Sequence, residues 1–239
     1  MNKLELYFHI PFCVRKCLYC DFLSAPADRT VQDAYMEALI KETVCRAGEY
    51  REYLVDTIFI GGGTPSAVDA EWIGKLLSVV YRDFHVSDKA EITMEVNPGT
   101  VEADRLKQYK KAGVNRLSIG LQSADNEELK RIGRIHSWED FERTYRLVRQ
   151  AGFVNVNVDV MSALPGQNVD SYRSTLQKIL ALNPQPEHIS AYSLIVEEGT
   201  PFYRMQEEGK LLLPDEDEER LMYEQTERIL AQAGYERYE

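Results

Sequence analysis

Short apolar runs alternate with amphipathic stretches along almost the whole chain. In the amphipathic stretches, apolar residues recur every three or four positions, which is the period of a helix with one buried face. The apolar runs are shorter, and several stop at glycine or at an Asn-Pro-Gly sequence, which favours strands. The pattern predicts strands at 4–10, 55–60, 90–96, 116–119, 154–160 and 188–194, and helices at 31–49, 70–81, 101–112, 125–132, 138–151, 171–182 and 215–233.

About six strand–helix units in succession, with strands that are mostly apolar on both faces, indicate an α/β fold. Such units form a parallel sheet with right-handed crossovers. An open doubly wound sheet and a barrel-like sheet both satisfy this pattern. We favour an incomplete (β/α)6 barrel, related to the TIM barrel, because candidate site residues follow at least five strands. A doubly wound sheet would concentrate its ligand contacts at one switch point.

We expect one core domain over residues 1–239. A length of 239 residues is long for a single domain but within the range of α/β barrels. The chain stops where a seventh strand could begin, which would leave a sheet edge exposed. We therefore expect it to be a fragment of a longer protein.

The composition suits a soluble protein that binds small molecules. The chain has 28 Lys and Arg against 39 Asp and Glu, a net charge of −11. Affinity for nucleic acid comes from basic charge, so we expect no nucleic-acid partner. No apolar run approaches the ~18 residues that predict a membrane span, and the N-terminus lacks a signal-peptide pattern. We expect no transmembrane segment and a cytoplasmic location, where clustered cysteines are metal ligands or catalytic groups more often than disulfides.

Three cysteines follow the first predicted strand at C-x3-C-x2-C spacing: Cys13, Cys17 and Cys20. Three thiolates this close together indicate ligands to a metal centre. A structural zinc ion requires a fourth ligand, for which His9 is the nearest candidate. An iron–sulfur cubane held by three cysteines leaves one iron open to a non-protein ligand, as a catalytic site requires. The spacing favours iron–sulfur but leaves zinc and redox chemistry open, and we interpret Cys45 as a core residue of a helix.

Other candidate site residues stand beside the cysteines or after the later strands. Residues 61–65, Gly-Gly-Gly-Thr-Pro, follow the second strand, and glycines allow a backbone to approach a ligand closely. This run is neither a P-loop nor a dinucleotide fingerprint. Glu95 ends the third strand, at the predicted mouth of the barrel. Arg134 follows the fourth strand, and a guanidinium is the natural partner of a carboxylate. Tyr7 and Tyr19 flank the cysteines, where they could stack on an adenine or shield a cluster from solvent.

The string Tyr7-x-His9-Ile10-Pro11-Phe12-Cys13-x3-Cys17-x2-Cys20 resembles the radical S-adenosylmethionine (SAM) superfamily. More narrowly, it resembles the oxygen-independent coproporphyrinogen III oxidase family, which includes the HemW-type heme chaperones. Further matches at 188–194 and 198–201 extend the resemblance over essentially the whole chain. The resemblance implies a [4Fe–4S] cluster on the three cysteines. It also implies that SAM chelates the fourth iron through its amino and carboxylate groups.

The resemblance also implies the residues that bind SAM. The glycine motif would meet the amino group of SAM, and the matching glutamate would contact SAM as well. Three later residues match family positions that line the pocket for SAM and a second ligand, and no catalytic residue is assigned beyond the cluster. The predicted cofactor-binding residues are Tyr7, Tyr19, Gly62, Gly63, Thr64, Glu95, Gln122, Arg134 and Asp159, and the predicted cluster ligands are Cys13, Cys17 and Cys20.

Residues 163–167, Ala-Leu-Pro-Gly-Gln, resemble the family sequence Gly-Leu-Pro-Gly-Gln. Ala163 stands where the family usually has glycine. If this position requires a positive φ, the added methyl group costs ~1 kcal/mol. We expect a small local change in the shape of the pocket.

Phe22 distinguishes between the members of this family. True coproporphyrinogen oxidases have another cysteine at this position, two residues after the third. The departure favours the HemW-like group, whose reported role is heme binding and delivery. The C-terminal heme-associated motif of the family does not occur in these 239 residues, so no heme ligand is assigned.

We therefore expect a HemW-like radical SAM protein that acts in heme or porphyrin metabolism as a heme chaperone. Its expected ligands are a [4Fe–4S] cluster, SAM, and heme or a porphyrinogen, and its expected partner is a reductant protein such as flavodoxin or ferredoxin. The core is in principle capable of reductive SAM cleavage. One alternative is an oxygen-independent coproporphyrinogen III oxidase, which performs oxidative decarboxylation through a 5′-deoxyadenosyl radical. The other is a non-catalytic, zinc-stabilised α/β protein.

Overall fold

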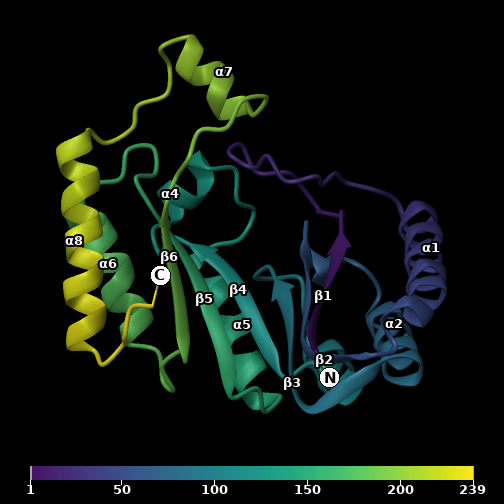
Figure 1. The fold of residues 1–239 in the computed structure, drawn as a ribbon. Coiled ribbons are helices and arrows are strands. Elements are labelled where there is room, and N and C mark those ends of the chain that lie inside the picture. Colours follow the sequence, from purple (N-terminus) through teal and green to yellow (C-terminus); the bar gives the residue numbers. More distant parts are fainter. Residues whose placement is uncertain (1, 239) are drawn as a thin grey trace. The chain divides into compact units, whose positions relative to one another are not determined.

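The computed structural model describes residues 2–238 and places six strands in one sheet (Figure 1). The strands follow one another across the sheet in chain order, and β1–β2, β2–β3 and β5–β6 pair in parallel. A strand order without reversal is that of a (β/α) barrel, because a doubly wound sheet reverses direction at its switch point. The strands span β1 Asn2–Ile10, β2 Tyr53–Gly62, β3 His85–Val96, β4 Arg116–Gln122, β5 Asn155–Ser162 and β6 His188–Ser193.

Helices occupy each of the stretches in which the periodicity predicts them. Their bounds differ from the predicted ones by a few residues at most. Gly113 ends α3 with a φ of 112°, as expected for a glycine that closes a helix. The helices span α1 Arg29–Ala47, α2 Ala70–Asp83, α3 Ala103–Ala112, α4 Asn126–Arg131, α5 Trp138–Gln150, α6 Val169–Leu180, α7 Pro201–Glu207 and α8 Glu216–Gln232, with 3-10 turns η1 Gly48–Tyr50 and η2 Pro65–Ala67.

Helix α7 is an element that the sequence pattern did not predict. Thr200 caps its start by accepting a hydrogen bond from the backbone N–H of Tyr203 at 3.1 Å, and Pro201 stands at its first position. Both are ordinary start signals for a helix. The helix spans only seven residues, too few for a helical period to become visible in the sequence.

The start of α4 carries a buried carboxylate. Asp125 caps the helix by accepting hydrogen bonds from the backbone N–H groups of Glu127 and Glu128, and its own N–H donates to Ser123 Oγ and not to the Glu128 carboxylate. Instead, Glu128 is 2% exposed and accepts hydrogen bonds from Ser123 Oγ at 2.6 Å, Gln167 Nε2 at 2.9 Å and Ser171 Oγ at 2.7 Å. A buried carboxylate needs such donors to offset its loss of hydration. The network connects the loops after β4 and β5 to the start of α6.

The chain divides into two compact units, which we describe separately. The first unit contains residues up to 15, 22–118 and 144–155, and the second contains 16–21, 119–143 and those from 156 onward. The prediction of one core domain stays a prediction. Within residues 2–238, no helix is both long and apolar enough to cross a membrane.

In the first unit, α1 and α2 pack against each other beside β1 and β2 (Figure 1). Ile60 in β2, Met94 in β3, and Ile73 and Leu76 in α2 are completely buried. These side chains form the apolar interior that holds the strand ends in place.

In the second unit, a buried apolar cluster packs against the segment that carries two of the cysteines. Leu18 and Tyr19 pack against it. The backbone N–H of Leu18 donates to the carbonyl of Ile132 at 3.1 Å, and the Leu18 carbonyl accepts from the N–H of Phe202 at 3.1 Å. The end of α4 and the start of α7 therefore hold the cysteine segment from two sides. The buried cluster consists of Leu129, Ile132, Met161, Leu164, Leu194 and Phe202.

Candidate functional site

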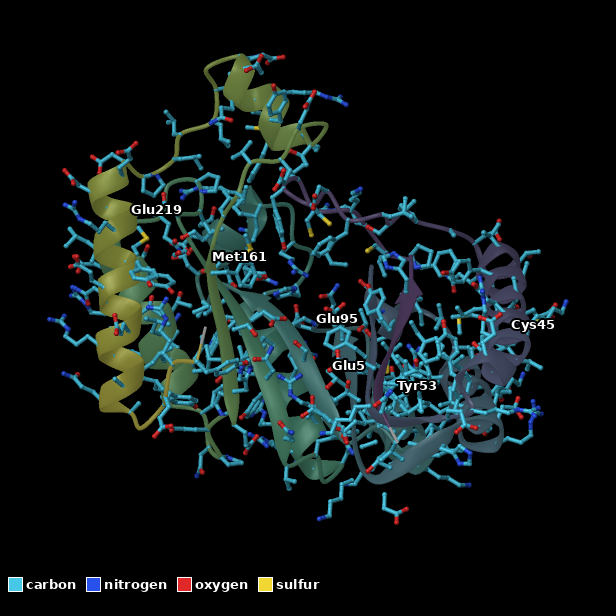
Figure 2. All side chains as sticks on the ribbon, in the orientation of Figure 1. Glu5, Cys45, Tyr53, Glu95, Met161 and Glu219 are labelled. Atoms are coloured by element: carbon cyan, nitrogen blue, oxygen red, sulfur yellow. The ribbon has the colours of Figure 1, made fainter. Side chains whose placement is uncertain are left out.

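The glycine-rich turn after β2 is bound to the end of β3 within the first unit. The backbone N–H of Gly62 donates to Oε2 of the half-buried Glu95 at 3.0 Å. In Figure 2, Tyr53, the first residue of β2, lies near one end of the strands, and Glu95 lies towards the other end. Two predicted site residues are thus in direct contact at the carboxyl ends of parallel strands, where α/β folds place their ligands.

The glycines are required by the protein's own packing. A Cβ at Gly62 would lie 2.7 Å from the His9 ring, and Gly62 has a φ of 116°. A Cβ at Gly63 would lie 2.7 Å from the carbonyl oxygen of Phe12. The sequence predicted close approach of a ligand, whereas the structure shows close approach of the end of β1 and the start of the cysteine loop.

Thr64 connects the glycine turn to the first cysteine. Its Oγ1 donates to the sulfur of Cys13 at 3.5 Å and accepts from Asn97 Nδ2 at 2.7 Å, and its backbone N–H donates to the Phe12 carbonyl at 2.7 Å. Hydrogen bonds to sulfur are among the features that tune iron–sulfur sites. Asn97 is a residue that the sequence analysis did not select, although it stands directly after β3 in an Asn-Pro-Gly turn.

Both ring nitrogens of His9 are engaged by the protein. Nε2 lies 2.8 Å from the carbonyl of Leu23, and Nδ1 lies 2.9 Å from the hydroxyl of Tyr7. A carbonyl only accepts, so Nε2 carries the proton and Nδ1 accepts from Tyr7. These contacts weigh against His9 as the fourth ligand of a zinc ion. The Tyr7 side chain is 59% exposed, and partial burial together with the charge of Glu95 raises its pKa.

In the second unit, Tyr19 and Arg134 are in contact. Arg134 Nη2 donates to the Tyr19 hydroxyl at 3.0 Å. Burial and the nearby Cys17 raise the pKa of Tyr19 to about 12, although Arg134 acts in the opposite direction. The Tyr19 hydroxyl is therefore neutral at physiological pH. It holds the guanidinium beside the segment that carries Cys17 and Cys20.

Gln122 is the last residue of β4 and has an unusual backbone. Its φ is 72°, a conformation that non-glycine residues adopt mainly at strained or functional positions. Its side chain is almost fully buried, and Oε1 accepts a hydrogen bond from the Tyr192 hydroxyl at 3.0 Å. Tyr192 lies on β6 and was not selected from the sequence.

Asp159 lies on β5 and is half-buried. Its Oδ1 accepts from Asn157 Nδ2 at 2.6 Å. Asp159 contributes to raising the pKa of Tyr192, after burial, so the two side chains are electrostatically coupled. The second unit thus contains Gln122, Asp159 and Arg134, which the sequence predicted, and Asn157 and Tyr192, which it did not.

The three motif cysteines form no disulfide bond and are partly exposed, as ligands accessible to an incoming cluster need to be. Among residues 2–238, no three or more His, Cys, Asp or Glu side chains are already gathered around one metal position. The donor set suits a soft iron–sulfur centre, because sulfur is its only ligand type. Cys45 is exposed on α1, so its interpretation as a core residue was wrong (Figure 2).

The family model described as the radical SAM superfamily matches residues 7–179, which is more than half of the chain. The chain belongs to the radical SAM superfamily. Membership in this superfamily implies a [4Fe–4S] cluster and SAM as cofactors.

Radical SAM relatives with curated names match over almost the entire chain. The heme chaperone HemW of Escherichia coli is 42% identical, and the match covers 100% of this chain and 62% of that protein. HemW of Bacillus subtilis is 38% identical, with 98% and 61% covered. The chain therefore spans about three fifths of the length of these relatives.

A solved radical SAM structure confirms the predicted fold class. Coproporphyrinogen III oxidase HemN of Escherichia coli, a radical SAM enzyme, matches with a TM-score of 0.87 at 28% identity. The match covers 98% of this chain and 54% of that chain. The incomplete (β/α)6 barrel inferred from the strand order is thus confirmed.

Proposed function

We propose that this chain is the radical SAM core of a HemW-like heme chaperone. The observation that carries the proposal is the 42% identity to HemW of Escherichia coli along the entire chain. Phe22 supports it, because it stands where the oxidases of the family have a cysteine. Heme as a ligand, a reductant protein as a partner and a cytoplasmic location are parts of this proposal.

Cys13, Cys17 and Cys20 would hold the cluster. Thr64 would donate to the Cys13 sulfur, as it does in the structure at 3.5 Å. When bound, the cluster supplies one electron for reductive cleavage of SAM. Leu18 fixes the segment between the other two cysteines through its backbone hydrogen bonds to Ile132 and Phe202.

Within the first unit, Gly62, Gly63, Thr64 and Glu95 would bind SAM. The Glu95 carboxylate fixes the Gly62 backbone and offers negative charge to the ammonium group of SAM. Within the second unit, Gln122, Arg134 and Asp159 would bind further polar groups of SAM or of a second ligand. The aromatic rings of Tyr7 and Tyr19 would stack on the adenine of SAM or shield the cluster from solvent.

Anaerobic reconstitution with iron and sulfide tests the proposal. The wild-type chain is expected to show the absorbance and electron paramagnetic resonance signals of a [4Fe–4S] cluster, and the signals should change when SAM is added. Alanine variants of Cys13, Cys17 and Cys20 should lose the cluster, whereas Cys45→Ala serves as the matched control and should keep it. A cluster retained by the three variants, or purified protein that contains zinc without iron or sulfide, would refute the proposal.

Heme transfer separates the chaperone from the oxidase. The structural match to HemN keeps coproporphyrinogen III oxidase as a second candidate. A heme chaperone should bind heme and pass it to an apoprotein while it consumes little SAM. An oxidase should form 5′-deoxyadenosine and decarboxylate coproporphyrinogen III. Decarboxylation without heme binding would decide for the oxidase.

A further inference from the structure

Three alternate residues of β6, His188, Ser190 and Tyr192, direct hydrogen bonds towards the two strands that precede it. Successive residues of a strand point to opposite faces, so these three share one face. In the parallel register, His188 lies opposite Asn157 and Ser190 lies opposite Asp159. All of these residues belong to the second unit.

The first of these hydrogen bonds fixes the amide of Gln122. The Tyr192 hydroxyl donates to Gln122 Oε1 at 3.0 Å. Burial and the charge of Asp159 raise the pKa of Tyr192, so its hydroxyl stays protonated and remains a donor. An amide whose oxygen is engaged in this way presents its NH2 group to any ligand it meets. Tyr192 therefore defines Gln122 as a hydrogen-bond donor.

The second set fixes Asp159 through Asn157. The Asp159 carboxylate accepts from Asn157 Nδ2 at 2.6 Å, which requires the amide oxygen of Asn157 to point away from it. That oxygen accepts from Ser190 Oγ at 3.1 Å and is also hydrogen-bonded to His188 Nδ1. His188 consequently carries its proton on Nδ1, and its Nε2 lies 2.5 Å from the Tyr238 hydroxyl. These hydrogen bonds together fix the orientation of the Asn157 amide and the tautomer of the His188 imidazole.

We propose that Tyr192, Ser190 and His188 are positioning residues that orient Gln122 and Asp159 for SAM. The inference rests on the proposed function, because SAM is the ligand. Gln122 supplies a donor for an acceptor atom of SAM, and Asp159 supplies a fixed carboxylate for a hydroxyl or amino group. SAM offers both kinds of group, so a wrongly oriented amide would replace an attraction by a repulsion.

The exposure of Tyr192 and the backbone of Gln122 both distinguish this arrangement from ordinary core packing. Tyr192 as a whole is 45% exposed although its hydroxyl end is buried enough to raise its pKa, so the hydrogen bond does not serve to bury the whole ring. Tyr172 offers the contrast, because it is 1% exposed and its hydroxyl lies 2.9 Å from Thr226 Oγ1 between α6 and α8. The positive φ of Gln122 also supports a functional role, because the chain keeps a strained backbone at the residue to which Tyr192 donates its hydrogen bond.

A double-mutant cycle on the anaerobically reconstituted chain tests the role of Tyr192, with the dissociation constant of SAM as the readout. Tyr192→Phe keeps the ring and should weaken SAM binding about fivefold, the effect of one hydrogen bond. In the Gln122→Ala background, the same change should have no further effect, because Tyr192 acts through Gln122. Tyr172→Phe is the matched control, which should lower the unfolding midpoint and leave SAM binding unchanged.

The role of His188 in orienting Asp159 is tested in the same assay. His188→Leu removes the donor to Asn157 and should weaken SAM binding several-fold, whereas His188→Asn, whose amide nitrogen takes the place of Nδ1, should restore most of it. In the Asp159→Ala background, both variants should bind SAM equally. The spectral change that SAM causes in the cluster signal provides a second readout for each variant.

The outcomes separate the two proposals. A wild-type chain that forms no cluster or binds no SAM overturns the proposed function and this inference together. A wild-type chain that binds SAM, with Tyr192→Phe and His188→Leu equal to it, overturns the inference alone. Equal weakening by Tyr192→Phe with and without Gln122 would also overturn it, because Tyr192 would then not act through Gln122.

Discussion

Gly63 lies so close to Phe12 that a Cβ at Gly63 would stand 2.7 Å from the Phe12 carbonyl oxygen and 2.9 Å from its nitrogen. Both atoms belong to the backbone that leads into Cys13, and neither can rotate away as a side chain could. The glycine turn after β2 therefore packs directly against the backbone at the start of the cysteine loop. The position of Cys13 depends on the absence of a side chain at residue 63.

Replacing Gly63 by alanine should displace the cysteine loop. We expect Gly63→Ala to lower the free energy of unfolding by about 1–3 kcal/mol, the range for overpacking. The iron content after reconstitution should fall at the same time. Gly74→Ala is the matched control, since nothing lies within 4 Å of a Cβ there, and in the middle of α2 it should add about 0.5–1 kcal/mol. Equal iron content in the two variants would contradict this role of Gly63.

The Glu95 carboxylate should be important for SAM binding through both its charge and its oxygen. Glu95→Ala removes the acceptor of the Gly62 N–H and should weaken SAM binding at least tenfold, because a hydrogen bond to a charged group contributes about 1.5–3 kcal/mol. Glu95→Gln retains an acceptor oxygen without the charge and should fall between the wild type and Glu95→Ala. Equilibrium binding of SAM to the reconstituted chain measures both.

Glu91 offers the matched control for Glu95 on the same strand. Its side chain is 47% exposed, and its Oε1 lies 3.9 Å from Nε of Arg116, close to the outer limit of an ion pair. Glu91→Gln should therefore change SAM binding by less than a factor of about two. A loss as large as that of Glu95→Gln would mean that the net charge of β3, and not the position of Glu95, determines SAM binding.

Local signals in the sequence predicted the strands and most helices, because each depends on neighbouring residues. Helix α7 was missed because seven residues show no period. Cys45 was placed on the wrong face, since a helical repeat alone does not say which side of α1 is buried. Tyr192 was missed for a different reason, as its partner Gln122 is 70 residues away in the chain. Contacts of this kind arise only when the sheet is assembled.

Ala163 is a position where the sequence anticipated a backbone feature. The resemblance to a glycine-containing motif suggested a positive φ, and the structure gives 59°. Ala163→Gly should therefore stabilise the chain by about 1 kcal/mol, because glycine adopts this conformation without steric cost. Ala181→Gly is the matched control at a φ of −81° and should destabilise slightly. Urea unfolding of both variants measures the difference, and a lower stability of Ala163→Gly would contradict the expected strain at this position.

His136 should make the stability of the chain depend on pH. It is 7% exposed, and its Nε2 lies 3.2 Å from the carbonyl of Leu121, the residue before Gln122. Burial, followed by the positive charge of Arg134, lowers the pKa of His136 to about 4. In the unfolded chain its pKa is about 6.5. Well above pH 6.5 the imidazole is neutral in both states and contributes no pH dependence.

As the pH falls from 6.5 towards 4, the unfolded chain binds a proton at His136 that the folded chain does not. The free energy of unfolding should therefore fall with decreasing pH, by about 2 kcal/mol at pH 5 and about 3 kcal/mol at pH 4 from this residue. Carboxylates also titrate in this range, so the comparison is with His136→Gln, which cannot bind the proton. Urea unfolding of that variant should show a shallower pH dependence than the wild type, while the exposed His85→Gln should follow the wild type. Identical pH profiles for His136→Gln and the wild type would mean that folding does not lower the pKa of His136, so that the imidazole becomes charged in the folded chain over the same pH range. The hydrogen bond between His136 Nε2 and the Leu121 carbonyl would then not require a neutral imidazole.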